Sequence, residues 1–286
     1  LGMGGYRMFK AEVPGGATFQ RDAPRIRDTA KVLWAFYIAI SAMETGLLRL
    51  AGMSWYDAVC HTFTTMSTGG YSTSSVSVAG WPTPGVQWVI IVFMFVAGAN
   101  FGVYQQIILG HQLRAALKDP EFKLYALVTA VVTALVFSIV HQAGSIEGGA
   151  EAEIRGAAFQ VVSISTTTGY GTEDFDRWPD VLRLVLVMLM FVGGCAGSTA
   201  GGMKLQRWMI FFKAAVVELR RTINPRGVLI VRIGDRPLER DVVANIMAFL
   251  AMFFCLWGVA TFLPTLLGMD MVSAATAAVS NLGNIG

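Results

Sequence analysis

Three short stretches of this sequence place threonine, serine and glycine where their oxygen atoms could bind a cation. They are Ser67-Thr68-Gly69-Gly70-Tyr71-Ser72, Thr167-Thr168-Gly169-Tyr170-Gly171-Thr172 and Gly283-Asn284-Ile285-Gly286. Glycine permits backbone conformations closed to other residues, so consecutive carbonyl groups can point the same way. Such carbonyls, with threonine hydroxyls, can replace the water shell of a monovalent cation. Because the stretches contain no carboxylate, K⁺ suits them better than Ca²⁺ or Mg²⁺, which recruit charged ligands.

Each stretch follows a short apolar segment, at 55–66, 152–165 and 270–282. These segments fall short of the roughly 20 residues that a membrane-spanning helix needs. We predict half-helices that enter from the outer face and end in extended loops. Non-helical backbone at membrane depth is tolerated only beside a polar cavity or inside protein, so the loops should line a water-filled path. The alternative is a glycine-rich packing loop that binds no ion.

Longer apolar segments predict the membrane-spanning helices that would position these loops. Four qualify directly: 32–50, 86–110, 123–143 and 242–267. A fifth begins near residue 178 and resumes beyond a glycine run to about residue 222. One continuous helix of that length would measure about 67 Å, against about 30 Å for the hydrocarbon core of a bilayer. The glycine run at 193–204 should therefore break the helix.

The composition agrees with a membrane protein. Of the 286 residues, 54% are apolar and only 14% are charged, against about 25% charged in soluble domains. The net charge of +3 and the scattered basic residues argue against nucleic acid as a partner. Three distant cysteines predict no disulfide framework, and the three histidines show no metal-ligand spacing.

The basic residues predict the orientation of the chain. Three stretches, 1–31, 111–123 and 204–241, hold 18 of the 22 lysines and arginines (six, three and nine). Because cytoplasmic loops are enriched in Lys and Arg, we predict that these stretches are cytoplasmic and that the pore loops lie on the outer side.

The sequence also repeats itself. Met66-Ser67-Thr68-Gly69 recurs as Thr166-Thr167-Thr168-Gly169, and 94–98 recurs as 190–194. We predict an all-α polytopic membrane protein in which repeated units of helix, re-entrant pore helix, loop and helix surround a central ion pore. The predicted units are 32–113, 114–223 and the first part of another at 241–286, with a cytoplasmic connector and short hairpin at 224–240. Since the sequence opens with Leu1 and stops in a glycine-rich run, we take it as an internal segment of a longer protein.

These stretches, together with the glycine-rich run from Gly193 to Lys204 and the end from Asn281 to Gly286, resemble the TrkH/TrkG/KtrB superfamily of K⁺ uptake proteins, most of all its TrkH branch. The resemblance covers nearly the whole sequence. It implies four pore repeats around one pore, in a homodimer of the bacterial inner membrane. This chain would hold the second and third repeats and part of the fourth, with 1–31 as a lead-in after a missing first repeat.

The resemblance assigns a K⁺ filter to twelve residues: Ser67, Thr68, Gly69, Gly70, Thr167, Thr168, Gly169, Tyr170, Gly171, Asn284, Ile285 and Gly286. Six of them would hold K⁺, with each filter glycine beside a threonine or isoleucine: Thr68 and Gly69, Thr168 and Gly169, Ile285 and Gly286. Ile285 makes this ring chemically unequal, and Thr-Gly-Gly-Tyr departs from tetrameric K⁺ channels. We therefore expect looser discrimination between K⁺ and Na⁺.

The same resemblance implies an intramembrane gate loop at 193–204. Its residues are Gly193, Gly194, Gly197, Ser198, Thr199, Ala200, Gly201, Gly202 and Lys204. Five glycines make a poor helix, at about 1 kcal/mol each against alanine, so the segment could change shape at small cost. The alternative is close helix packing through small residues, which we favour at the equivalent stretch 98–102. Lys204 is either an anchor at the membrane interface or a residue that contacts the gate or repels cations. Glu44 is either a functional intramembrane carboxylate or the partner of a nearby base.

The function implied by the resemblance is K⁺ translocation through a gated, carbonyl-lined filter, with Na⁺ and Rb⁺ as further candidate ions. No covalent cofactor is expected, and nucleotide would act only through a cytosolic TrkA/KtrA-type nucleotide-binding ring. The basic stretches 114–123 and 204–240 could meet that ring or anionic membrane lipids. A cation-coupled K⁺ symporter and a non-conducting assembly subunit stay open as alternatives. An enzyme is not expected, because the spans lack paired acids, a His–Glu set and Gly-x-Ser-x-Gly.

Overall fold

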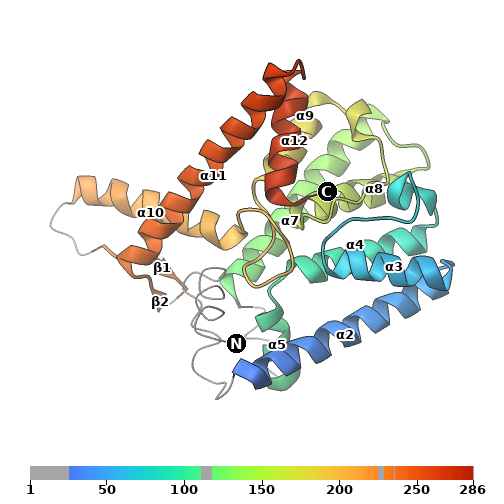
Figure 1. The fold of residues 1–286 in the computed structure, drawn as a ribbon, viewed down its shortest axis with the longest axis horizontal. Coiled ribbons are helices and arrows are strands. Elements are labelled where there is room, and N and C mark those ends of the chain that lie inside the picture. The colour runs from blue at the N-terminus through green and yellow to red at the C-terminus, as the bar shows by residue number, and fades with distance from the viewer. Residues whose placement is uncertain (1–25, 111–117, 225–228, 235, 286) are drawn as a thin grey trace.

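The computed structural model describes residues 26–110, 118–224, 229–234 and 236–285 (Figure 1). Most of these residues are helical, which confirms the predicted all-α class. The helices in chain order are α2 (Ile26–Leu50), α3 (Trp55–Met66), α4 (Pro84–Gly98), α5 (Phe101–Gly110), α7 (Pro120–Ala143), α8 (Ala150–Ser165), α9 (Asp180–Met190), α10 (Leu205–Ile223), α11 (Arg240–Leu266) and α12 (Met271–Gly283). Short 3₁₀ turns lie at Ser77–Gly80 and Phe175–Arg177. Most of the predicted cytoplasmic segments 1–31 and 111–123 falls outside the described residues.

Three helices within the described ranges are long and apolar enough to cross a membrane, judged by length and composition. They are Lys31–Leu50 of α2, Pro120–Ala143 (α7) and Arg240–Leu266 (α11). These helices confirm the predicted spans at 32–50, 123–143 and 242–267. Large apolar side chains on α11, such as Leu256 and Phe262, are exposed, as expected for a surface that contacts lipid.

The predicted span at 86–110 is wrong as a single helix. α4 ends at Gly98, Ala99 is extended (φ −91°, ψ 160°), and α5 starts at Phe101. The Oδ1 atom of Asn100 accepts a hydrogen bond from the backbone N–H of Gly102 at 2.7 Å. Because this side chain satisfies an N–H group at the start of α5, it stabilises a new helix start and hence the break.

The three predicted half-helices are confirmed as α3, α8 and α12. Two of them begin with a polar side chain that binds a backbone N–H group of the first turn. Ser54 accepts from the N–H of Asp57 at 3.1 Å, and Asp270 accepts from the N–H of Ser273 at 3.0 Å. Each of the three helices ends in a non-helical loop that contains predicted filter residues.

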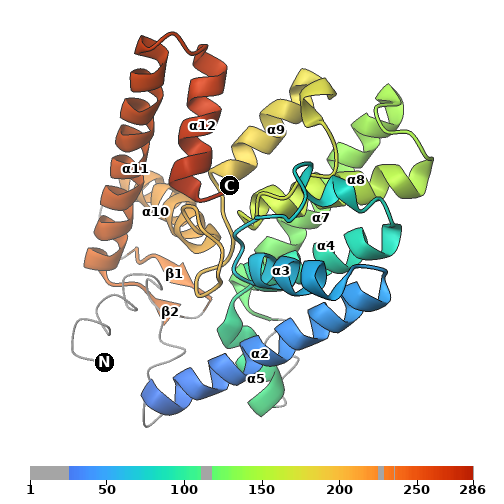
Figure 2. The same ribbon diagram turned by 45° about the vertical axis from the view of Figure 1, so that its right-hand side comes forward.

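The packing places α8 between other helices. It contacts α4 on one side and α7 and α9 on the other, and its residues from Gly156 to Ser165 are buried. Separate apolar clusters fill the space between α2, α3, α4 and α8, between α7, α8 and α9, and between α10, α11 and the hairpin. α11 and α12 lie side by side in both views (Figures 1 and 2).

Two further predictions concern the chain between α9 and α11. The fifth apolar segment is interrupted after Met190 and resumes as α10 at Leu205, which confirms the break at the glycine run. The connector at 224–240 contains the predicted hairpin, formed by β1 (Arg232–Ile233) and β2 (Arg236–Pro237). These strands pair antiparallel, and the N–H of Leu238 donates to the carbonyl of Val231 at 2.9 Å.

Candidate functional site

The loop after α3 turns back onto the end of its helix. Ser67 is the C-cap residue, and Thr68 adopts a left-handed backbone with φ of 53°. This turn directs the N–H groups of Gly69 and Gly70 to the carbonyl oxygen of Thr64, over 2.7 and 3.3 Å. The N–H groups of the loop are therefore used to close the helix end, and its carbonyl groups point elsewhere.

The loop after α8 has the same geometry. Thr167 is left-handed with φ of 57°. The N–H groups of Thr168 and Gly169 donate to the carbonyl oxygen of Ser163 over 2.9 and 3.3 Å. The two loops therefore share one backbone conformation.

The loop after α12 begins in the same way. Asn284 is left-handed with φ of 56°, and the N–H of Ile285 donates to the carbonyl oxygen of Ser280 at 2.9 Å. Gly286, the last predicted filter residue, lies outside the described residues. As far as the chain is described, the third loop matches the first two.

These turns set a register between the loops that differs by one residue from the predicted register. Gly70 and Gly169 are equivalent, since both are left-handed (φ 66° and 83°) and both follow the residue that closes the turn. Gly69 is instead equivalent to Thr168, and it is not left-handed. Gly69 is the third residue after the end of α3 at Met66, whereas Gly169 is the fourth residue after the end of α8 at Ser165. The predicted pairing of Gly69 with Gly169 is therefore wrong.

The first two loops touch each other and leave their carbonyl groups without partners. A Cβ atom added at Gly70 would lie 1.9 Å from the carbonyl oxygen of Thr168, so only glycine fits there. Within the described residues, the carbonyl oxygens of Thr68–Gly70 and Thr167–Gly169 accept no hydrogen bond. Three of these residues, Thr68, Thr167 and Thr168, are buried, and nearly all buried backbone carbonyls in proteins are bonded. This group of six free acceptors is therefore suited to a cation.

Tyr170 joins the loop after α8 to the helix α3. The side chain is buried, and its hydroxyl group lies 2.5 Å from Oγ1 of Thr64 and donates to the carbonyl of His61 at 3.2 Å. Burial raises the pKa of Tyr170 to about 12, so the phenol stays neutral at physiological pH. Gly171, another predicted filter residue, accepts a hydrogen bond from the N–H of Ala79 at 3.2 Å. Both residues brace the loops and present no free carbonyl to a cation.

The glycine-rich loop at 193–204 meets the ends of all three short helices. Oγ1 of Thr68 donates to the carbonyl of Thr199 at 2.9 Å, and the N–H of Gly201 donates to Oγ1 of Thr167 at 2.5 Å. A Cβ atom at Gly201 would lie 2.3 Å from the carbonyl oxygen of Gly283, at the end of α12. The loop therefore contacts the predicted filter from three sides, as a gate would have to.

The opposite side of this loop is held by the break between α4 and α5. The N–H of Cys195 donates to the carbonyl of Gly98 at 2.9 Å, and the N–H of Phe101 donates to the carbonyl of Gly197 at 3.2 Å. Within the stretch 98–102, Gly98 is closely packed, because a Cβ atom there would lie 2.6 Å from side-chain atoms of Thr166 and Tyr125. The hydrogen bonds to the loop were not predicted.

Lys204 lies inside the loop. Its backbone is left-handed (φ 65°), its side chain is buried, and Nζ donates to the carbonyl groups of Ser198, at 3.4 Å, and Ala200. An ammonium group anchored at a membrane interface would face water instead. Of the two interpretations of Lys204, the position favours the contact with the loop. The neighbouring Gly194 accepts from the N–H of Leu205 at 2.9 Å, which joins the loop to α10.

Glu44 is buried in α2, and no salt bridge joins it to a base among the described residues. Neither of its carboxylate oxygens forms a hydrogen bond of standard geometry with a described residue, although the Thr65 side chain of α3 lies close by. Arg49, the base expected nearby, donates to the carbonyl of Met53 at 3.0 Å and lies over the ring of Trp55. The pairing of Glu44 with a nearby base is therefore not found, and its interpretation as a functional carboxylate remains.

Sequence reasoning missed two side chains beside the loop. The Oε1 atom of Glu121, at the start of α7, accepts a hydrogen bond from the N–H of Ala196 at 2.6 Å. Asn100, which starts α5, lies against Gly197, where a Cβ atom would be 3.2 Å from its Oδ1 atom. Both occupy helix starts, so their sequence signal is that of an ordinary cap. No group of three or more His, Cys, Asp and Glu residues that could hold a metal occurs in the described part of the chain.

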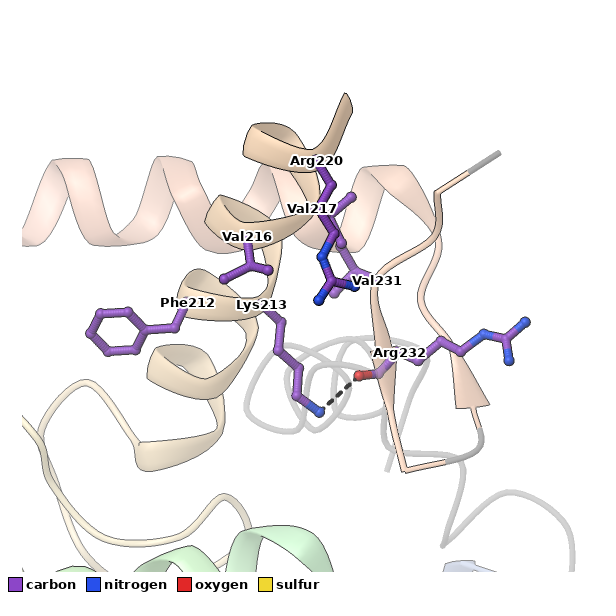
Figure 3. Close-up of a pocket in the computed structure, with 7 residues that line it drawn as sticks. All are labelled: Phe212, Lys213, Val216, Val217, Arg220, Val231 and Arg232. Atoms are coloured by element: carbon purple, nitrogen blue, oxygen red, sulfur yellow. Dashed lines mark hydrogen bonds between the residues drawn. The ribbon is translucent and has the colours of Figure 1, made fainter. Parts of the chain in front are cut away.

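A separate hollow of about 300 Å³ lies between α10 and β1 (Figure 3). It is lined by Phe212, Lys213, Val216, Val217, Arg220, Val231 and Arg232. The Nζ atom of Lys213 donates to the carbonyl of Arg232 at 3.0 Å. The hollow belongs to the predicted cytoplasmic region and contains no predicted filter or gate residue.

The fold and the site define a polytopic helical membrane protein in which short helices end in carbonyl-rich loops. The chain belongs to the TrkH family, whose model, described as a cation transport protein, matches residues 1–286.

The alignments with known relatives cover the whole chain. The Trk system potassium uptake protein TrkH of Salmonella typhimurium is 33% identical over 286 residues, which are all of this chain and 59% of that protein. TrkG of Escherichia coli K12 is 27% identical over the same share of both chains. The crystal structure of the potassium transporter TrkH from Vibrio parahaemolyticus matches with a TM-score of 0.87 and 30% identity, over 99% of this chain and 61% of that one. The chain thus spans less than two thirds of these relatives.

Proposed function

We propose that this chain is part of a K⁺-translocating membrane subunit that passes the ion through a filter of backbone carbonyls. The observation that supports it is the set of six carbonyl oxygens at Thr68–Gly70 and Thr167–Gly169 that accept no hydrogen bond from described residues. Oxygen ligands that replace the hydration shell are what a monovalent cation needs to enter a narrow pathway. The relatives are named as potassium uptake proteins, which agrees with this choice of ion.

The ligands follow the register of the helix ends. We assign the filter glycines to Gly70, Gly169 and Gly286, each preceded by a ligand residue: Gly69, Thr168 and Ile285. The three short helices end at these loops, so the negative ends of their dipoles favour a cation. Thr68 contributes its carbonyl group, while its hydroxyl group already bonds to the loop at 193–204.

The loop at 193–204 acts as the gate in this proposal. It contacts the filter loops through the hydroxyl groups of Thr68 and Thr167 and crosses beneath the end of α12. Its path between α9 and α10 is non-helical, so a change in its shape does not require a helix to unfold. Opening would break a small number of hydrogen bonds, each worth about 1 kcal/mol net.

The cellular setting follows from charge and from the family. We place the pore loops outside and the basic stretches 1–31, 111–123 and 204–241 in the cytoplasm of a bacterial inner membrane. We propose a homodimer, and a TrkA/KtrA-type nucleotide-binding ring on the cytoplasmic face, where anionic lipids could also bind. The units 32–113, 114–223 and 241–286 are proposed as pore repeats, joined by the connector at 224–240. We propose no enzymatic activity and no resident cofactor.

Uptake of radioactive Rb⁺ tests the proposal. The whole protein is reconstituted into liposomes loaded with K⁺, and tracer uptake is followed with and without unlabelled K⁺ outside. We expect uptake that external K⁺ competes away and that Gly169→Ala abolishes, while Gly171→Ala, whose Cβ atom meets nothing within 4 Å, retains it. Uptake no faster than in empty liposomes, with the protein folded and correctly inserted, would refute K⁺ translocation.

One observation supports a second candidate, the cation-coupled symporter. Glu44 is a buried carboxyl group with no described hydrogen-bond partner, and such groups inside membranes commonly bind protons or ions. If transport is coupled to protons, an inward pH gradient will drive Rb⁺ accumulation, and Glu44→Gln will remove that drive. If the pathway is a channel, accumulation will follow the membrane potential alone.

A further inference from the structure

The loop between α9 and α10 is held differently in its two halves. Residues 195–197 bond to the backbone of the α4–α5 break and to a carboxylate of α7. Residues 198–202 bond to threonine hydroxyls of the filter loops and to the ammonium group at the end of the loop. Left-handed glycines lie at both ends of the second half, Gly197 with φ of 72° and Gly202 with φ of 71°.

The first half is joined to groups that the helix break makes available. In a continuous helix the carbonyl of Gly98 and the N–H of Phe101 would bond to residues one turn away. Here they bond to Cys195 and Gly197 instead. Asn100 stabilises the break by binding the N–H of Gly102. The backbone groups of Gly98 and Phe101 are therefore held in place by the helices themselves. The first half therefore rests on rigid helical backbone.

Glu121 adds a side-chain contact to this half. Its side chain is buried, and Oε1 accepts the N–H of Ala196 at 2.6 Å. Glu121 lies in the first turn of α7, which Asp119 caps by accepting from the N–H of Phe122 at 2.9 Å. The carboxyl group is thus carried by the capped first turn of α7.

The second half is joined to α4 through a rotatable side chain, because Oγ1 of Thr199 donates to the carbonyl of Ala97 at 3.1 Å. It contacts the filter loops through rotatable hydroxyl groups, those of Thr68 and Thr167. The long side chain of Lys204 holds Ser198 and Ala200 from within the loop. All of these groups can follow the loop or release it without moving a helix. The hydrogen bonds of the first half cannot be broken in that way.

We propose that Glu121 is the positioning residue of the gate: it holds residues 195–197 stationary, so that only residues 198–202 move when the pathway opens. This inference rests on the proposed role of the loop as a gate, and it divides that loop at Gly197. The carboxylate acts through the backbone of the loop and touches no ion.

Cysteine accessibility tests the division directly. In the whole protein with Cys60→Ala, Cys255→Ala and any cysteine outside this chain also replaced by alanine, Cys195 is the remaining thiol and reports the stationary half. Ala200→Cys in a background with Cys195→Ala reports the mobile half. Both are labelled in proteoliposomes with a small cationic methanethiosulfonate during K⁺ flux. We expect the thiol at position 200 to react at least tenfold faster than Cys195.

Variants of Glu121 then test the residue itself. Glu121→Ala removes the acceptor and should raise the labelling rate of Cys195 at least tenfold. Glu121→Gln keeps an oxygen at the same place and should leave that rate within about threefold of the parent. Glu218→Ala is the matched control, an exposed acid of α10 that pairs only with Arg221 among described residues. It should change neither labelling nor Rb⁺ uptake.

Two results would overturn the inference. One is equal labelling of Cys195 in the parent and in Glu121→Ala. The other is parallel labelling of positions 195 and 200 during flux, which needs no Glu121 variant and so decides the matter even if Glu121→Ala does not fold. The labelling is read independently of transport. If Rb⁺ uptake is absent while Cys195 is protected by Glu121, the proposed function fails and the positioning contact stands.

Discussion

The register of the filter loops can be tested by exchanging one hydrogen atom for a methyl group at two neighbouring glycines. Gly70 is left-handed, and a Cβ atom there would lie 1.9 Å from a backbone oxygen, the carbonyl of Thr168. Alanine costs about 1–2 kcal/mol in this conformation. The clash adds to that cost, because the loops must separate by about 1.5 Å, from 1.9 to 3.4 Å, before the contact becomes ordinary.

The expected loss of transport follows from these energies. A penalty of 1–2 kcal/mol lowers the population of the intact filter about 5- to 30-fold, since each 1.36 kcal/mol corresponds to a factor of ten. Gly70→Ala should therefore reduce the maximal rate of Rb⁺ uptake at least fivefold. Gly69→Ala should keep it within about twofold, because Gly69 is not left-handed and its Cβ atom would meet Oγ of Ser67 at 3.3 Å.

The assay is initial Rb⁺ uptake into proteoliposomes at saturating external Rb⁺, normalised to the amount of correctly inserted protein. Size-exclusion chromatography of each variant in detergent checks that both fold. If Gly69→Ala abolishes uptake and Gly70→Ala does not, the register taken from the helix ends is wrong and the register taken from the Thr-Gly letters is right. If the two variants are equally active, the contact between the loops does not control transport.

Three other outcomes are expected. Tyr170→Phe removes the hydroxyl that bonds to Thr64, which should cost about 1–3 kcal/mol and lower the melting temperature by several degrees; an unchanged melting curve would contradict the bracing role. Lys204→Met releases two loop carbonyls and should raise basal Rb⁺ leak about threefold or more, whereas Lys213→Met on α10 should not. Burial lowers the pKa of His61, so its folded state binds protons less readily than the unfolded chain, and stability should fall as pH drops below about 6.5. Replacing His61 by Gln should flatten that pH dependence of thermal unfolding.

The short helices and the glycine break could be predicted because their signals are local. Each half-helix is an apolar segment that ends in Thr or Asn next to Gly, and α3, α8 and α12 lie within two residues of the predicted ranges. The break at 193–204 follows from glycine content alone. The interruption at 99–100 has a local signal too, but Asn100 in an otherwise apolar stretch does not reveal whether it caps a new helix or packs inside a longer one.

The remaining features depend on contacts between distant parts of the chain. Gly70, and not Gly69, is equivalent to Gly169 because of where each short helix ends. The repeated sequence motif does not indicate that end. Glu121 looks like an acid at a helix start, and its partner Ala196 is 75 residues away. Lys204 resembles any basic residue near a membrane boundary, and only the fold of its own loop turns the ammonium group inward.

The hydroxyl group of Thr68 is bonded to the carbonyl of Thr199, and that of Thr167 is bonded to the N–H of Gly201. If the loop at 193–204 moves away as proposed, both hydroxyl groups lose these partners. The resting and conducting forms would then offer a passing ion different sets of oxygen atoms. Discrimination among alkali ions would consequently depend on how long the conducting form lasts, so permeability ratios measured in brief and prolonged openings need not agree.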